Sequence, residues 1–193
     1  MTSGFNVVAV IFVLVFGGVI LWGLNWRWTL LSLGVLYGVV FALVLYSWDI
    51  GLAAVKLIVG WMALAILGTS PMITTALPSE EPSSKKIFRV VWFCIAALIA
   101  IPAAQKTILW IPAQEVIMIC GLIFIGAGLV QVGLNSKPIP IITGLLLLLA
   151  GFEIIYASIV TSILVAGLLA VITLGIALVG SYLMITPQMG GES

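Results

Sequence analysis

The sequence is poor in charge and contains no histidine. Only 7% of its 193 residues are charged, whereas 64% are apolar; a typical soluble domain has about 25% charged residues. Because so few charges cannot cover a water-facing surface, we predict that the chain lies in lipid. The lack of histidine removes the commonest ligand of haem and zinc and the usual catalytic base. The sequence therefore predicts no cofactor, no metal site and no enzymatic activity of its own.

The cysteines and the net charge exclude further kinds of site and partner. Cys94 and Cys120 both fall inside apolar runs and are expected to be packing residues rather than a disulfide or ligand pair. The formal net charge is +1, which gives no reason to expect nucleic acid as a partner. The first residues hold no basic n-region of a signal peptide, and the apolar run after them is expected to be a first transmembrane helix.

Apolar runs of membrane-spanning length recur along the chain. A spanning helix needs about 20 mostly apolar residues. Candidate spans cover about 5–24, 29–46, 50–68, 87–103 and 115–134, and the run 139–184 is long enough for two more. We expect the break between those two near 158–162, where serine and threonine cluster. The predicted fold is therefore all-α, a polytopic transmembrane bundle of about seven helices.

One segment, 69–86, has the composition of a loop. It contains Pro71, Pro78, Pro82 and four serines, and proline is poorly tolerated in a helix interior. We expect it to separate a three-helix half, 1–68, from a four-helix half, 87–193. In the second half Pro102 is expected to close its helix, and 107–114 is expected to lie at the surface.

Basic residues predict an orientation. With seven spans, one side of the membrane receives five Lys or Arg residues and the other receives only Lys106. The five are Arg27, Lys85, Lys86, Arg89 and Lys137. Because cytoplasmic loops carry the excess of Lys and Arg, we expect the loop 69–86 and the C-terminus to be cytoplasmic and the N-terminus to be outside.

Small residues predict where helices pack closely. Gly34 and Gly38 form a GxxxG pair, and Gly126 and Gly128 lie together in the fifth span. Small residues at such positions let helix backbones approach in lipid. The pattern leaves open whether these contacts lie within the chain or with a partner.

The charges inside apolar runs are the candidate functional residues. A charge in the bilayer centre costs about 2.5–3.5 kcal/mol on insertion scales and is usually functional. Lys56 and Glu153 stand well inside their runs, and Asp49 stands at an edge. Lys56 is long enough to reach the interface by snorkelling, with Asp49 two turns away on the same face. Glu153 is too short for that, so it is either protonated or paired with a cation or a water chain.

The predicted topology puts the two inner charges at one depth. Lys56 follows the outer start of the third span, and Glu153 precedes the outer end of the sixth. Each is then roughly 9–10 Å from the same interface at 1.5 Å per residue. We therefore expect Lys56 and Glu153 to face one another or to share a hydrated cavity.

Two stretches resemble known membrane subunits. The segment 121–183, with GFEIIYAS around Glu153 and a basic turn at Lys137, resembles the K subunit of bacterial complex I and its relatives in multi-subunit cation/proton antiporters. The segment 5–68, with WDIGLAAVK ending at Lys56, is similar to the J subunit and its antiporter counterparts. The K-like part departs from that family because its last span has no second acidic residue.

The resemblance implies a non-catalytic subunit of a proton- or cation-translocating complex related to complex I, membrane-bound hydrogenases or antiporters. It implies that Glu153 lies on a proton path, and it implies other membrane subunits as partners besides lipid. From their places in or beside apolar runs, Lys56 and Asp49 are added as candidates for the same intramembrane charge path. It also implies the cytoplasmic (inner) membrane of a prokaryote. The alternatives are a stand-alone small secondary transporter, whose paired repeats are not evident here, and a purely structural membrane subunit.

Overall fold

The computed structural model describes residues 2–23, 25–69, 82–111 and 113–185, and these residues form seven α-helices and no strand. The helices are α1 (Thr2–Trp22), α2 (Trp26–Val44), α3 (Ile50–Gly68), α5 (Ser83–Thr107), α6 (Glu115–Gly133), α7 (Pro138–Ile159) and α8 (Ile163–Ile185). Within the described residues, six helices, α2 to α8, are long and apolar enough to cross a membrane. The apolar part described for α1, Val7–Trp22, is shorter. The chain is therefore an all-helical integral membrane protein.

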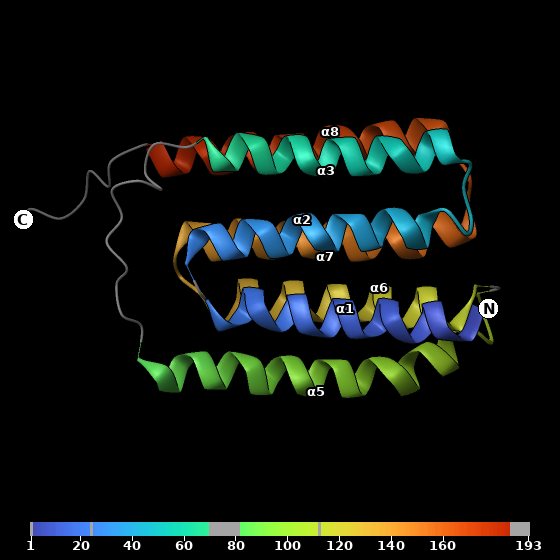
Figure 1. Ribbon diagram of the computed structural model, residues 1–193, viewed down its shortest axis with the longest axis horizontal. Helices are drawn as coiled ribbons and strands as arrows, with labels where there is room; N and C mark the ends of the chain where they lie inside the picture. Colours follow the sequence, from blue (N-terminus) through green and yellow to red (C-terminus); the bar gives the residue numbers. More distant parts are fainter. Residues whose placement is uncertain (1, 24, 70–81, 112, 186–193) are drawn as a thin grey trace, which may run out of the picture.

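The helices form two layers (Figure 1). In one layer α1, α2 and α3 lie side by side, and in the other α6, α7 and α8 do so. Across the layers α1 contacts α6, α2 contacts α7 and α3 contacts α8, while α5 lies at one edge against α1 and α6. The predicted three-helix segments at the two ends of the sequence are thus packed face to face. The buried side chains, including Leu36, Phe124 and Leu147, fill the space between them.

The helices alternate in direction, so α1 begins and α8 ends at opposite ends of the bundle (Figure 1). The turn after α1, the start of α5 and the turn before α7 share one end, which we call the basic end because it carries Arg27, Lys85, Lys86 and Lys137. The opposite end carries Lys106 with the acidic residues Asp49 and Glu115. This segregation agrees with the predicted charge asymmetry, and which end faces the cytoplasm stays a prediction.

Two predicted boundaries are confirmed. The third helix covers Ile50–Gly68 as expected, and the long apolar run is divided where α7 ends at Ile159 and α8 begins at Ile163. Trp110, in the stretch expected at the surface, is 89% exposed. Of the two cysteines, Cys120 is buried as a packing residue should be, whereas Cys94 is exposed on the bundle surface.

The fourth predicted span is wrong at both ends. Helix α5 starts at Ser83, inside the segment expected to be a loop, and continues through Pro102 to Thr107. Proline is tolerated just before a helix because the first turn leaves its N–H groups without helical partners, and Pro82 stands there as the N-cap. Pro102 interrupts one helical hydrogen bond, which membrane helices accommodate. Pro71, Pro78 and Pro112 lie outside the described residues.

Glycines set the close approach of α6 and α7. A methyl group on Gly128 would lie 2.6 Å from the backbone nitrogen of Leu148, and one on Gly151 would lie 2.6 Å from the carbonyl oxygen of Gly121. A methyl group on Gly144 would lie 2.8 Å from the Val132 side chain and 3.0 Å from the carbonyl oxygen of Gly128. Such distances require glycine, because a real Cβ would push the backbones apart.

The other predicted packing glycines differ among themselves. A methyl group on Gly126 would lie 3.0 Å from Ala96, and one on Gly34 would lie 3.3 Å from Leu64. Gly38 has nothing within 4 Å of such a methyl group among the described residues. Gly38 therefore makes no close helix contact among the described residues, and a contact with a partner stays a prediction.

We expect Gly128→Ala to destabilise the protein by about 1–3 kcal/mol, the usual cost of inserting atoms into a packed core. The matched control is Gly38→Ala, which should leave stability unchanged or slightly raised, because alanine has the higher helix propensity. Thermal unfolding of both variants in one detergent compares them. Equal stability of the two variants would contradict the close α6–α7 packing.

Candidate functional site

A buried ion pair joins the two layers. The Nζ atom of Lys56 on α3 lies 2.7 Å from Oε1 of Glu153 on α7, and the ammonium donates a hydrogen bond to the carboxylate. Each side chain is only 3% exposed. Neither group is therefore an interfacial charge, and the alternative in which Lys56 snorkels to the surface does not occur.

The pair forms because its two residues lie at one depth. Lys56 is six positions after the start of α3 at Ile50, and Glu153 is six positions before the end of α7 at Ile159. These two helix ends share one end of the bundle (Figure 1). At 1.5 Å per residue both side chains start roughly 9 Å inside the bundle from that end. The expectation that Lys56 and Glu153 face one another is confirmed.

A third helix contributes to the surroundings of the ammonium. The Lys56 Nζ atom lies 3.5 Å from the backbone carbonyl oxygen of Ala166 on α8, which is a long hydrogen bond. Ala166 lies three positions after the first residue of α8, and its own side chain is buried. Lysine thus meets a full negative charge and a carbonyl dipole, which together offset part of its desolvation cost.

A tyrosine from α2 completes the site. Tyr37 is 3% exposed and lies within electrostatic range of the Glu153 carboxyl group. Its ring packs on Gly60, one helical turn after Lys56 on α3, where any Cβ atom would collide with the ring. Gly60 therefore makes the room for an aromatic side chain to pack against α3 one turn from Lys56. The sequence predicted neither residue, because the Tyr37–Gly60 contact joins different helices.

The end of the bundle nearest the ion pair is closed by a tryptophan. Trp48 precedes α3, is 5% exposed, and donates an Nε1–H hydrogen bond of 3.2 Å to the carbonyl oxygen of Val160. Val160 follows α7, so this bond ties the α2–α3 turn to the α7–α8 turn. Both connections flank the elements that hold Lys56 and Glu153, so Trp48 helps to hold the two helices in register.

Asp49 does not belong to the site. It is the N-cap residue of α3, it is exposed, and it makes no side-chain capping hydrogen bond. Asp49 lies two turns before Lys56 at the start of α3, but the Lys56 side chain is directed inward to Glu153 and not toward Asp49. Its predicted place in an intramembrane charge path has no support in the packing.

A second buried polar cluster lies near the basic end. Arg89 on α5 is 4% exposed, and its Nη1 atom donates a 2.6 Å hydrogen bond to Oδ1 of Asn135. The Asn135 amide donates in turn to the backbone oxygen of Gln131, whose side chain is 2% exposed. Gly23 in the α1–α2 turn adopts φ 66° close to the Arg89 guanidinium. The sequence placed Arg89 near the start of the span 87–103, among the basic residues of one membrane side, and did not predict that its side chain is buried.

The fold and the ion pair define a helical membrane protein with a charged centre between two three-helix layers. Among the described residues no group of three or more His, Cys, Asp or Glu residues is placed to hold a metal ion. Comparison of the chain with protein-family models, with curated proteins and with solved structures finds no match. The resemblance to the J and K subunits therefore stays a prediction.

We expect Lys56→Met and Glu153→Gln each to destabilise the protein by about 3–5 kcal/mol, because either change leaves one buried group without its partner. The double variant Lys56→Met/Glu153→Gln should lose much less than the sum of the two single losses, since no lone charge remains. Thermal or denaturant unfolding in detergent measures all four proteins. Additive losses would show that the two side chains do not interact.

Proposed function

We propose that the protein is a non-catalytic membrane subunit of a proton- or cation-translocating complex, in which Lys56 and Glu153 form a polar station inside the membrane. The observation that carries the proposal is the fully buried 2.7 Å ion pair between α3 and α7. An ionisable pair inside a membrane protein is costly and usually marks an ion or proton pathway. A pair needed only for packing could be replaced by apolar residues of similar volume.

The chemistry of the pair suits transient proton exchange. Shifting a proton across the 2.7 Å hydrogen bond between Nζ and Oε1 converts two charges into a neutral amine and a neutral carboxyl group. A charge that arrives nearby would therefore shift the balance between the charged pair and the neutral pair. Tyr37, buried within electrostatic range of Glu153, adds a further hydroxyl group to the same centre.

Further buried polar side chains support a path away from the pair. Ser32 on α2, Thr143 on α7 and Thr173 on α8 are each 2% exposed or less, and Gln131 lies buried on α6. Ser32, Thr143 and Thr173 lie nearer to the basic end than Tyr37, Glu153 and Ala166 on the same helices. Gln131 lies near the end of α6 that is at the basic end. These residues and Arg89 lie on the basic-end side of the ion pair, so the bundle interior has buried polar groups between the pair and that end, as a proton pathway requires.

The outer surface supports a role as a subunit. Large apolar side chains are exposed all along α5 and α8, including Trp92 and Leu98 on α5 and Leu164 and Val171 on α8. Lipid or neighbouring membrane subunits can cover such a surface. The described residues add almost no extramembrane mass in which a separate catalytic domain could form.

The test starts from the natural membrane. We expect the affinity-tagged chain, extracted in mild detergent, to co-purify with larger membrane subunits, and the intact complex to translocate ions in liposomes. Glu153→Gln and the double variant Lys56→Met/Glu153→Gln should both lower translocation at least about tenfold, the equivalent of about 1.4 kcal/mol. Glu115→Gln is the matched control, because Glu115 is exposed at the same end of the bundle.

The outcomes separate the three candidate roles. Normal translocation by an assembled complex that carries the double variant would show that the pair is structural. Purification as a monomer that transports ions by itself would favour a stand-alone transporter. Impaired translocation with normal assembly, and with Glu115→Gln unaffected, is the result that the proposal predicts.

A further inference from the structure

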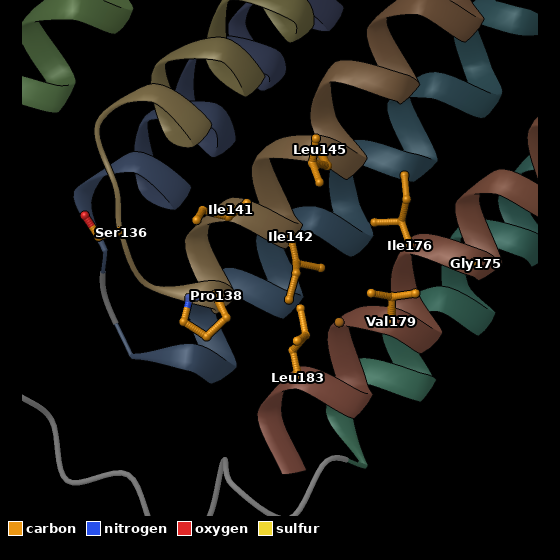
Figure 2. A pocket seen from close by; sticks show the side chains of 10 residues that line it. Ser136, Pro138, Ile141, Ile142, Leu145, Gly175, Ile176, Val179 and Leu183 are labelled. Carbon is orange, nitrogen blue, oxygen red and sulfur yellow. The ribbon is translucent and has the colours of Figure 1, made fainter. Parts of the chain in front are cut away.

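A groove between α7 and α8 opens at the basic end of the bundle. It has a volume of about 640 Å³ and is lined on α7 by Pro138, Ile142 and Leu145 and on α8 by Ile176, Val179 and Leu183. Figure 2 shows side chains from the two helices pointing toward one another across it. Val179 is 59% exposed and Leu183 is 50% exposed, so the groove is open at the side of the bundle.

Two glycines of α8 shape the groove. A methyl group on Gly180 would lie 2.8 Å from Ile142, so α8 touches α7 at that point. A methyl group on Gly175, in contrast, would meet nothing within 4 Å, although Gly175 lines the groove. The groove is therefore hollow at Gly175 because this position carries no side chain.

The length of the groove fits one leaflet of a bilayer. From Pro138 to Leu145 it follows α7 for roughly 10 Å, and from Gly175 to Leu183 it follows α8 for roughly 12 Å, at 1.5 Å per residue. One leaflet of the hydrocarbon core is about 15 Å deep. A partner helix that crosses the membrane would need a contact surface about twice as long, whereas a lipid acyl chain ends within its leaflet.

The charge at the mouth of the groove selects the head group. Lys137 is the exposed N-cap residue of α7 and stands between two lining residues, Ser136 and Pro138. Arg27, at the start of α2, which contacts α7, is exposed at the same end of the bundle. Basic residues beside a gap between membrane helices attract anionic lipid head groups.

We propose that this groove is a binding site for an anionic phospholipid, with one acyl chain between α7 and α8 and the head group at Lys137. The lipid would fill the space between α7 and α8 beside their contact at Gly180, where α8 also packs against α3. It would also make the α7–α8 pair, which carries Glu153 and Ala166, more resistant to separation. The site is independent of the role proposed for the ion pair.

The full-length chain, delipidated in mild detergent, tests the proposal by native mass spectrometry with added dioleoyl phosphatidylglycerol or dioleoyl phosphatidylcholine. We expect the anionic lipid to bind more tightly and to raise the melting temperature. Lys137→Gln should weaken its binding about fivefold, the equivalent of about 1 kcal/mol for one basic residue near a membrane surface. Lys106→Gln, at the opposite end, should leave it unchanged.

The groove itself is tested by Gly175→Leu, which should fill the hollow, keep the fold and abolish binding of phosphatidylglycerol. Gly167→Leu is the matched control, because Gly167 is exposed on the same helix, has nothing within 4 Å of an added methyl group, and lies outside the groove. Phosphatidylglycerol with a photoactivatable acyl chain should label α7 and α8 in the wild type and in Gly167→Leu. Equal binding of the two lipids, undiminished binding to Gly175→Leu, or labelling elsewhere would overturn the proposal.

Discussion

The ion pair between Lys56 and Glu153 is the interaction on which the arrangement of this bundle depends. Lipid gives helices no hydrophobic reason to associate, so close packing and polar contacts must hold them together. Lys56 belongs to the layer of α1, α2 and α3, and Glu153 belongs to the layer of α6, α7 and α8. Because a lone charge in that position is strongly unfavourable, the pair constrains both layers to one relative placement.

Other contacts act around this constraint. Trp48 ties together the two turns nearest the pair, and the Tyr37 ring packs on Gly60, one turn from Lys56. Along α6 and α7 the glycines bring two backbones together, and at the basic end Arg89 connects α5 with the α6–α7 turn. The bundle thus has a polar link toward each end and a tightly packed glycine seam within one layer.

Much of this fold follows from the sequence because spanning length and helix direction are simple quantities. The length of apolar runs predicted Ile50–Gly68 and the break before Ile163. Alternating direction, together with 1.5 Å per residue, placed Lys56 and Glu153 at one depth. Depth is a property of one helix at a time, so no knowledge of the packing was needed to predict that the two residues could meet.

Rotation of each helix about its axis is what the sequence could not provide. It decides that Lys56 faces inward, that Gly38 has no close neighbour among the described residues, and that Arg89 is buried. Nearly uniform apolar composition removes the contrast between faces that reveals rotation in a soluble helix. The same uniformity hid the contacts of Gly60, Gly144 and Gly151. The rotation of each helix is defined by the contacts that its charged residues and glycines make with neighbouring helices.

The charge state of Glu153 tests the account most directly. An infrared difference spectrum of the wild-type protein minus Glu153→Gln, recorded at neutral pH in lipid, isolates the signal of this one carboxyl group. The account predicts the paired stretching bands of an ionised carboxylate, as expected for a partner of the Lys56 ammonium. A single carbonyl band of a protonated carboxyl group would contradict the ion pair on which the packing and the proposed function rest.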